Sequence, residues 1–257
     1  MKLEKQLYNI LQYLSTIDDI LAYNGNQLLV QKSKVGSDFV EVDVPTFFKE
    51  KIVIFSLSKF LRLFSFGKGK NESNESIQDW ILSQEFSPTN NAMGVMFINS
   101  PGKTVRLLQG AGGFLEKRAH YCKPKFDNIQ LEHSIKFQIT QQMYKQILSD
   151  CSLLDLDTIT IVSETSTKIR IYLTKKDKGL TDNYTTYEVD CEHEHQDLKI
   201  SFTLSSFNLI EATDHQLEYG TFITPTGSEN MLLKVRSFCD NNYIVKKLII
   251  GLKGVKL

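Results

Sequence analysis

A pattern of nine residues that occurs twice limits the possible folds of this chain more than any other feature. Residues 55–63 read Phe-Ser-Leu-Ser-Lys-Phe-Leu-Arg-Leu, and residues 202–210 read Phe-Thr-Leu-Ser-Ser-Phe-Asn-Leu-Ile. A second pair of segments, 6–11 and 142–148, matches at nearly the same separation along the chain. The sequence therefore predicts two related halves. A duplicated chain without a visible catalytic constellation is more typical of a scaffold or a symmetric assembly than of an enzyme.

The length of 257 residues suits two domains of ordinary size. Gly110-Ala-Gly-Gly113 and the charged run through Lys125 indicate the end of the first half and a connector. We therefore expect an N-terminal domain over residues 1–122 and a C-terminal domain over residues 123–257. Residues 67–76 are polar and rich in Gly and Ser, which predicts a surface loop.

Composition narrows the class of protein. The chain is 41% hydrophobic and 23% charged, as in soluble globular proteins, and it has no apolar run of the roughly 20 residues that a membrane helix needs. Its first residues carry charges where a signal peptide has an apolar run, so we expect a cytoplasmic protein without membrane contact. Lys and Arg number 30, as do Asp and Glu, which disfavours a protein that coats nucleic acid through global positive charge.

Hydrophobic periodicity predicts an α+β fold in each half. Apolar residues at helical spacing from Leu3 to Leu14 predict an opening amphipathic helix, and Asn24-Gly25-Asn26 predicts a hairpin turn. A short helix is expected within each copy of the repeated pattern, capped in the first copy by Ser56 or Ser58. A further helix is expected at 140–149, and strands at 39–44, 52–55, 79–84, 94–98, 104–108, 135–139, 158–162, 168–173, 185–189, 199–202, 218–223, 231–235 and 245–250. This order predicts domains in which a few helices cover one face of antiparallel sheets.

Two segments could in principle carry chemistry. Cys191-Glu-His-Glu-His195 contains possible metal ligands, but two histidines at a spacing of two suit neither a HExxH site nor a zinc finger, so a solvated loop is the better interpretation. Gly110-Ala-Gly-Gly113 lacks the Lys and Ser or Thr of a phosphate-binding loop. We therefore expect no catalytic residue, no metal site and no cofactor.

Several segments, taken in order, resemble the sliding clamps of T-even-type bacteriophages. In the first half these are Met1-Lys-Leu, the helix and hairpin after it, and Leu57-Ser-Lys-Phe-Leu-Arg-Leu63. In the second half, residues 139–148 and 154–161 are similar to the third helix and the following strand of the family. The resemblance covers nearly the whole chain and rests on packing patterns in their order and spacing. The chain departs from the family pattern at 67–76, at 87–113 and after Tyr243.

The resemblance implies a function as well as a fold. Each subunit would have two clamp domains, and three subunits would close head to tail into a homotrimeric ring, with sheets outside and helices lining the hole around duplex DNA. Such a ring tethers a DNA polymerase, is placed on DNA by a clamp loader, and can also serve viral transcription in the host cell cytoplasm. We therefore expect a non-enzymatic processivity factor. The alternative is a viral structural or assembly protein with duplicated sheet domains.

The resemblance also implies which side chains contact DNA. Basic residues on the helices that line the hole would attract phosphates without reading bases. The expected DNA contacts are Lys2, Lys5, Lys59, Arg62 and Lys145. The second copy of the pattern has Ser206 and Asn208 at or near the positions of Lys59 and Arg62, so the first half is expected to supply more of the attraction. The alternative interpretation is that these basic residues only keep helix faces soluble.

Partner proteins of the phage clamp family insert a short apolar tail into a groove near the domain connector. By resemblance, this groove would be lined by Ile129, Leu131, Leu248 and Ile250. The alternative, that each of the four is an ordinary core residue, stays open.

Overall fold

The structure is a computed structural model that divides the chain into two compact units. Met1–Gly36 and Val40–Pro124 form the N-terminal unit, and Ser37–Phe39 and Lys125–Leu257 form the C-terminal unit. No helix in the described part of the chain is long and apolar enough to cross a membrane. The expected loop at 67–76 and most of the expected connector lie outside the described residues. The described residues are 5–31, 38–44, 51–65, 81–86, 93–100, 103–111, 125–176, 178, 180–194, 197–224, 226–240 and 243–255.

In its described residues, the N-terminal unit combines two helices with antiparallel strands of one sheet. The helices are α1 (Lys5–Ile17) and α2 (Leu57–Ser65). The strands are β1 (Leu21–Tyr23), β2 (Gln27–Gln31), β3 (Asp38–Asp43), β4 (Ile52–Ile54), β5 (Ile81–Phe86), β6 (Met93–Ser100) and β7 (Lys103–Ala111). They follow the order β5-β6-β7-β4-β1-β2-β3, and the β1–β2, β1–β4, β4–β7, β5–β6 and β6–β7 pairs are antiparallel. The predicted opening helix, the hairpin and the strands of this half are confirmed.

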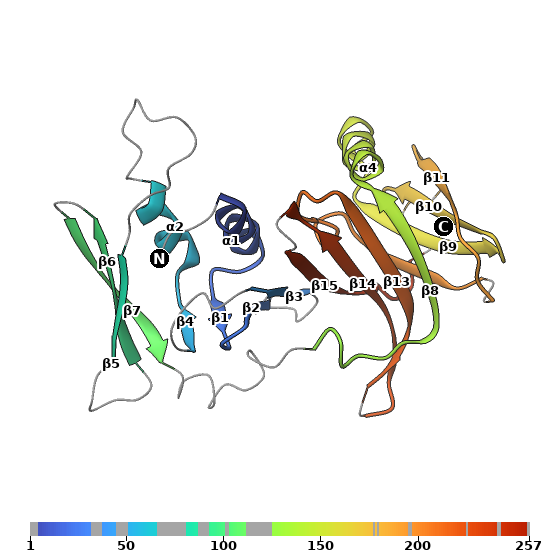
Figure 1. The fold of residues 1–257 in the computed structure, drawn as a ribbon. Coiled ribbons are helices and arrows are strands. Elements are labelled where there is room, and N and C mark those ends of the chain that lie inside the picture. The colour runs from blue at the N-terminus through green and yellow to red at the C-terminus, as the bar shows by residue number, and fades with distance from the viewer. Residues whose placement is uncertain are drawn as a thin grey trace. The chain divides into compact units, whose positions relative to one another are not determined.

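Both helices of this unit bury one apolar stripe, because their apolar residues recur every three or four positions. The two helices contact each other and lie on the same side of the sheet (Figure 1). On α1 the buried residues are Leu7, Ile10, Leu11, Tyr13 and Leu14, and on α2 they are Leu57, Phe60 and Leu61. The strands β1 and β4 are buried at every position, so they form the floor of this core.

An aspartate from outside α2 caps the helix. The Ser58 N–H donates to Asp19 Oδ1 at 2.6 Å, the Ser56 hydroxyl donates to Asp19 Oδ2 at 2.8 Å, and the Leu57 N–H donates to the Asp19 carbonyl at 2.8 Å. These bonds satisfy N–H groups that the first turn of a helix leaves without partners. The sequence predicted a cap from Ser56 or Ser58 themselves, whereas the structure places the capping carboxylate 39 residues before Ser58.

In its described residues, the C-terminal unit contains one helix, α4 (Gln141–Leu153), and two sets of antiparallel strands that belong to different sheets. One sheet runs β11-β10-β9-β12, and the strands β15, β14, β13 and β8 are neighbours in the other. The predicted strands and the α4 helix are confirmed, with Thr140 as the N-cap. The strands are β8 (Glu132–Thr140), β9 (Thr158–Thr165), β10 (Lys168–Thr174), β11 (Thr185–Asp190), β12 (Lys199–Thr203), β13 (Asp214–Ile223), β14 (Glu229–Phe238) and β15 (Ile244–Ile250).

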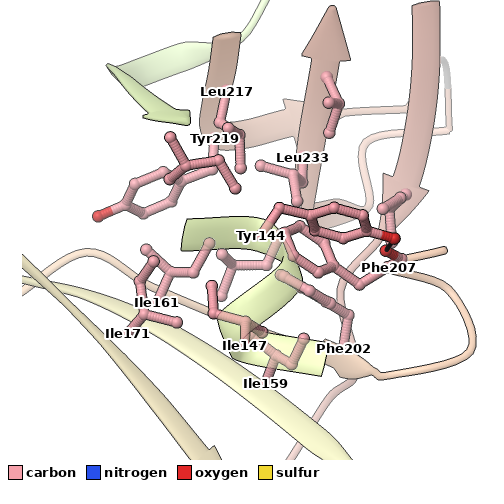
Figure 2. Packing of buried hydrophobic residues seen from close by; sticks show 14 of the residues in the cluster. Tyr144, Ile147, Ile159, Ile161, Ile171, Phe202, Phe207, Leu217, Tyr219 and Leu233 are labelled. Atoms are coloured by element: carbon pink, nitrogen blue, oxygen red, sulfur yellow. Dashed lines mark hydrogen bonds between the residues drawn. The ribbon is translucent and has the colours of Figure 1, made fainter. Parts of the chain in front are cut away.

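The core of this unit is formed by the inward residues of both sheets and the buried side of α4. Ile147 of α4 lies among Ile159, Ile161 and Ile171 of one sheet, while Leu217, Tyr219 and Leu233 approach from the other (Figure 2). Because side chains alternate along a strand, the residues between these positions face away from the core.

The second copy of the repeated pattern is not a helix, so that prediction is wrong. After β12, residues Leu204–Phe207 form a turn, in which the Phe207 N–H donates to the carbonyls of Thr203 and Leu204 at 3.3 and 3.0 Å. The hydroxyl of Tyr144 holds the following residues: it accepts from the Leu209 N–H at 2.8 Å and lies 3.3 Å from the carbonyl oxygens of Phe207 and Leu209 (Figure 2).

Candidate nucleic-acid interface

The outward side of α1 is polar but carries little charge. Its exposed positions, Asn9, Gln12 and Thr16, recur at helical spacing opposite the buried stripe. Lys2 lies outside the described residues, and Lys5 begins α1 with a side chain that is also outside them. The described part of this helix therefore offers hydrogen-bonding groups rather than cations.

The outward side of α2 carries the two predicted basic residues. Lys59 and Arg62 are both exposed and lie three residues apart, which places them on neighbouring turns of one helix face. Burial alone would raise the pKa of Asp19, but the hydrogen bonds from Ser58 and Ser56, together with the charge of Lys59, hold that pKa below its usual range. Asp19 is therefore ionised at neutral pH and offsets part of the charge of Lys59.

The outward side of α4 has one predicted basic residue, Lys145. Its Nζ lies 2.8 Å from Glu211 Oε1, and both side chains are largely exposed to solvent. This ion pair lowers the pKa of Glu211, and it cancels the charge that Lys145 would present. The other exposed residues of this face include Gln142, Gln146 and Ser149, so it is as weakly charged as that of α1.

The four predicted groove residues lie in or beside the β13–β14–β15 part of the C-terminal unit. Leu248 is 4% exposed and stands opposite Lys234 in the strand register, while the Lys234 ammonium donates to the Ile129 carbonyl at 2.8 Å. A Cβ added to Gly220 would come within 3.2 Å of Leu131 Cβ, so Leu131 packs closely on β13. Ile250 is 41% exposed and pairs with Leu232.

The strand register sets the separation within this predicted set. Gly220, beside Leu131, pairs with Leu232, which in turn pairs with Ile250. Two strand spacings, or about 10 Å, therefore separate Gly220, the neighbour of Leu131, from Ile250. Lys234 bonds the Ile129 carbonyl through its side chain and pairs with Leu248 in the strand register. The buried state of Leu248 fits the alternative of an ordinary core residue.

A charged network that the sequence did not predict holds residues 126–129 against β14 and β15. Asp127 binds Lys246 at 2.7 Å and Arg236 at 3.2 Å, and these two cations lower the pKa of its carboxyl group. The buried ring of Phe126 lies 4.8 Å from Lys234 Nζ and 5.0 Å from the Arg236 guanidinium carbon. The alternation of Lys234 and Arg236 on β14, with Lys246 on the neighbouring β15, was a signal that could have pointed to it.

The Cys191–His195 segment is less solvated than predicted. Cys191 lies with its sulfur 2.8 Å from the Lys136 carbonyl, and both ring nitrogens of His193 are buried without a hydrogen-bond partner. His195 lies outside the described residues. Within the described ranges, no group of three or more His, Cys, Asp and Glu side chains is placed to hold a metal ion.

Comparison with known proteins finds no matching family model and no matching curated protein. Solved structures do match over nearly the full chain. A chain in the PCNA2–PCNA3 complex from Sulfolobus tokodaii superposes with a TM-score of 0.60 and 13% identity, covering 98% of this chain and 97% of that one. PCNA of A. fulgidus, solved with the C-terminal region of FEN-1 bound, superposes with a TM-score of 0.60 and 12% identity, covering 99% and 98%.

A bacterial structure matches over a smaller share of its own length. Caulobacter crescentus pol III beta superposes with a TM-score of 0.53 and 10% identity, covering 98% of this chain and 66% of that one. Identities this low demonstrate the fold alone. The chain has the two-domain fold of the DNA clamps, an α+β fold of mostly antiparallel sheets with few helices, and the predicted fold class is confirmed.

Proposed function

We propose that this protein is a sliding clamp, which encircles duplex DNA and tethers the replicative DNA polymerase for processive synthesis. The observation that carries the proposal is the match to whole PCNA chains over 98% and 99% of this chain. In this role the protein acts by topology and has no catalytic site. The domain assignment of 1–122 and 123–257 belongs to the same proposal.

Weak contact between the helices and DNA is a requirement of sliding, and the outward helix faces suit it. Asn9, Gln12, Gln142 and Gln146 are neutral hydrogen-bonding groups that exchange one phosphate for the next at little cost. Lys59 and Arg62 add local positive charge, which attracts the duplex without reading its sequence. Lys2, Lys5 and Lys145 complete the proposed DNA-facing set.

The proposed assembly is a homotrimer closed head to tail, with two clamp domains from each subunit. Among the described strands of the C-terminal unit, β11 is the last of its sheet, so one side of it pairs with no strand of that set and is proposed to accept a further one. Thr186, Glu188 and Asp190 of β11 are exposed, while Tyr187 and Val189 pack against the core. This alternation fixes which face of the strand points toward solvent. A ring removes such open edges, which otherwise invite aggregation.

The partners in this proposal are duplex DNA, a DNA polymerase and a clamp loader. The groove for their apolar tails is placed at Ile129, Leu131, Leu248 and Ile250, of which Ile250 is the most exposed. The T-even phage origin, activity in the host cell cytoplasm and a further role in viral transcription are extensions of the same proposal, supported by the sequence resemblance.

Retention on circular DNA tests the clamp directly. The protein is assembled on nicked plasmid with a clamp loader, and the complex is separated from free protein by gel filtration. We expect the protein to stay with circular DNA and to leave after the plasmid is cut, because a ring slides off an end. Equal retention on cut and uncut plasmid would mean ordinary binding and would contradict the proposal.

Two further measurements separate the clamp from a viral structural protein. Light scattering should give a mass near three subunits for a clamp, whereas a strict monomer or an open polymer favours the alternative. Primer extension with the cognate polymerase and loader should give longer products when the protein is added. If product length never changes, the processivity function fails.

A further inference from the structure

A cavity of about 410 Å³ lies on the face of the β8–β13–β14 strands that points away from the core of the C-terminal unit. Its polar lining residues alternate along the strands with Phe137, Leu217 and Val235, which belong to the core. Phe137 and Leu217 also contribute to the lining. The cavity is large enough for several side chains of a bound segment, since ligand pockets begin at roughly 300 Å³.

Two rows of polar side chains cross the floor of this cavity. In the first row, Glu218 of β13 stands between Lys136 of β8 and Lys234 of β14. In the second row, Gln216 stands between Gln138 and Arg236. The ring of Phe126 closes one side against Lys234 and Arg236.

The charge of this cavity is positive. Lys136, Lys234 and Arg236 contribute three positive charges and Glu218 one negative charge, which leaves a net charge of plus two. Including the neighbouring Asp127 and Lys246 adds one charge of each sign and leaves that sum unchanged. Lys136 Nζ lies 3.8 Å from Glu218 Oε1, and the Lys136 side chain is 74% exposed. This lysine is therefore loosely held and can pair with an acidic ligand.

The two glutamines of the floor suit the backbone of a bound peptide. Among the described residues, neither Gln138 nor Gln216 has a side-chain hydrogen-bond partner, although Gln216 is half-buried between two charged strands. A glutamine amide carries both donors and acceptors, which is the complement of a peptide group. Phosphate chains offer acceptors only, and Glu218 in the middle of the floor would repel a continuous row of phosphates.

We propose that this cavity binds an acidic peptide segment of a partner protein, with a carboxylate between Lys136 and Arg236 and its backbone on Gln138 and Gln216. The site differs from the apolar groove of the proposed clamp in its polar floor on β8, β13 and β14, although Lys234 of this floor also donates to the carbonyl of Ile129 in the groove set. The site requires only the C-terminal unit and does not depend on ring closure or on DNA.

Fluorescence anisotropy tests the proposal with the full chain at low ionic strength. The probe is a labelled peptide of alternating Glu and Ala, and its counterpart has Gln in place of every Glu. We expect the acidic peptide to bind at least about tenfold more tightly than the neutral one. Equal affinities for the two peptides would overturn the proposal.

Charge reversal then locates the site. Lys136→Glu, at an exposed position, and Gln216→Glu, in the second row of the floor, should each weaken acidic-peptide binding by about tenfold. Lys176→Glu makes the same charge change on an exposed loop of the same unit and should leave binding within about twofold of the original. Thermal unfolding confirms that each variant is folded, and Lys136→Glu alone suffices if Gln216→Glu unfolds.

Two results would refute the location or the ligand. If Lys176→Glu weakens binding as much as Lys136→Glu does, the peptide reads only overall charge and the cavity is not its site. If short duplex DNA displaces the peptide and its own binding falls in Lys136→Glu, the surface binds nucleic acid instead.

Discussion

The two copies of the repeated pattern begin with the same backbone contact and then diverge. In the first copy the Leu57 N–H donates to the Asp19 carbonyl at 2.8 Å, and in the second the Leu204 N–H donates to the Asp157 carbonyl at 2.8 Å. Asp19 turns its carboxylate onto Ser56 and Ser58 and caps a helix. Asp157 turns its carboxylate onto Thr158 and the Lys176 N–H instead, so the second copy lacks this cap.

The side chains of the second copy also disfavour a helix. Asn208 takes the place of the buried Leu61, which interrupts the apolar stripe of a helix, and Leu209 takes the place of the exposed Arg62 and is buried. Ser and Asn also have lower helix propensity than Lys, Leu and Arg. Tyr144 then anchors the resulting turn. The comparison teaches that a repeated apolar pattern predicts a shared location in the domain but not a shared local conformation.

Acid should weaken the C-terminal unit before the N-terminal one, and this is the largest effect we expect. His215 is fully buried, bonds Ser237 at 2.8 Å and Gln141 of α4 at 3.0 Å, and packs on Tyr144. Burial lowers its pKa from 6.5 to about 4, so the unfolded chain binds a proton first as pH falls. Stability is therefore complete above pH 6.5 and falls by about 3 kcal/mol by pH 4.

The pKa of Asp19 is held below the ordinary aspartate value of 3.8, so the α2 cap remains in place until the pH falls below that value. Hydrogen exchange at pH 7 and pH 5, corrected for intrinsic rates, should show loss of protection in residues 141–153 and 204–215 while residues 57–65 stay protected. Replacing the exposed His133 with Asn should not change this response. Simultaneous loss in both units would mean that another group controls the acid transition.

Removing the Tyr144 hydroxyl should destabilise the turn of the second copy and spare the helix of the first. Tyr144→Phe leaves the buried Leu209 N–H without its partner and should lower the free energy of unfolding by about 2 kcal/mol. Urea denaturation measures this value, and Tyr184→Phe, at a half-exposed ring, is the matched control. An unchanged unfolding midpoint in Tyr144→Phe would mean that the Tyr144 hydroxyl does not stabilise the turn.

The two equivalent aspartates allow a direct test of the cap. Asp19→Ala should cost about 1 kcal/mol and increase hydrogen exchange in the first turn of α2. Asp157→Ala should leave exchange in 204–210 unchanged and loosen the chain near Lys176, whose N–H it binds at 2.7 Å. Equal responses in the two repeats would contradict the difference in carboxylate placement.

The smallest effect concerns DNA contact, because exposed charges act weakly one at a time. Lys59→Glu combined with Arg62→Glu should weaken retention on circular DNA several-fold at low salt, since both side chains are exposed. Lys145→Glu should do less, because Glu211 already neutralises Lys145. Adding Lys5→Glu should abolish the remaining retention on circular DNA, while light scattering still reports an intact oligomer. A change in the mass of the oligomer would assign these residues to assembly instead.

Most elements were predictable because they follow from local patterns. The apolar stripe from Leu7 to Leu14 specified α1, the Asn24-Gly25-Asn26 turn specified the β1–β2 hairpin, and the helical spacing over 140–149 specified α4. The same patterns misplaced the second short helix, although Asn208 at the Leu61 position was visible in the sequence. The DNA-facing and groove residues stay predictions.

By itself, the sequence determined the duplicated α+β organisation, because periodicity and turn residues act within a few positions of the chain. The tertiary structure decided which carboxylate caps α2, which turn Tyr144 anchors, that Lys145 is paired, and that Phe126 and Asp127 join the cations of β14 and β15. These contacts connect residues 39 to 119 positions apart. Their geometry depends on how sheets and helices pack, and no local pattern encodes that packing.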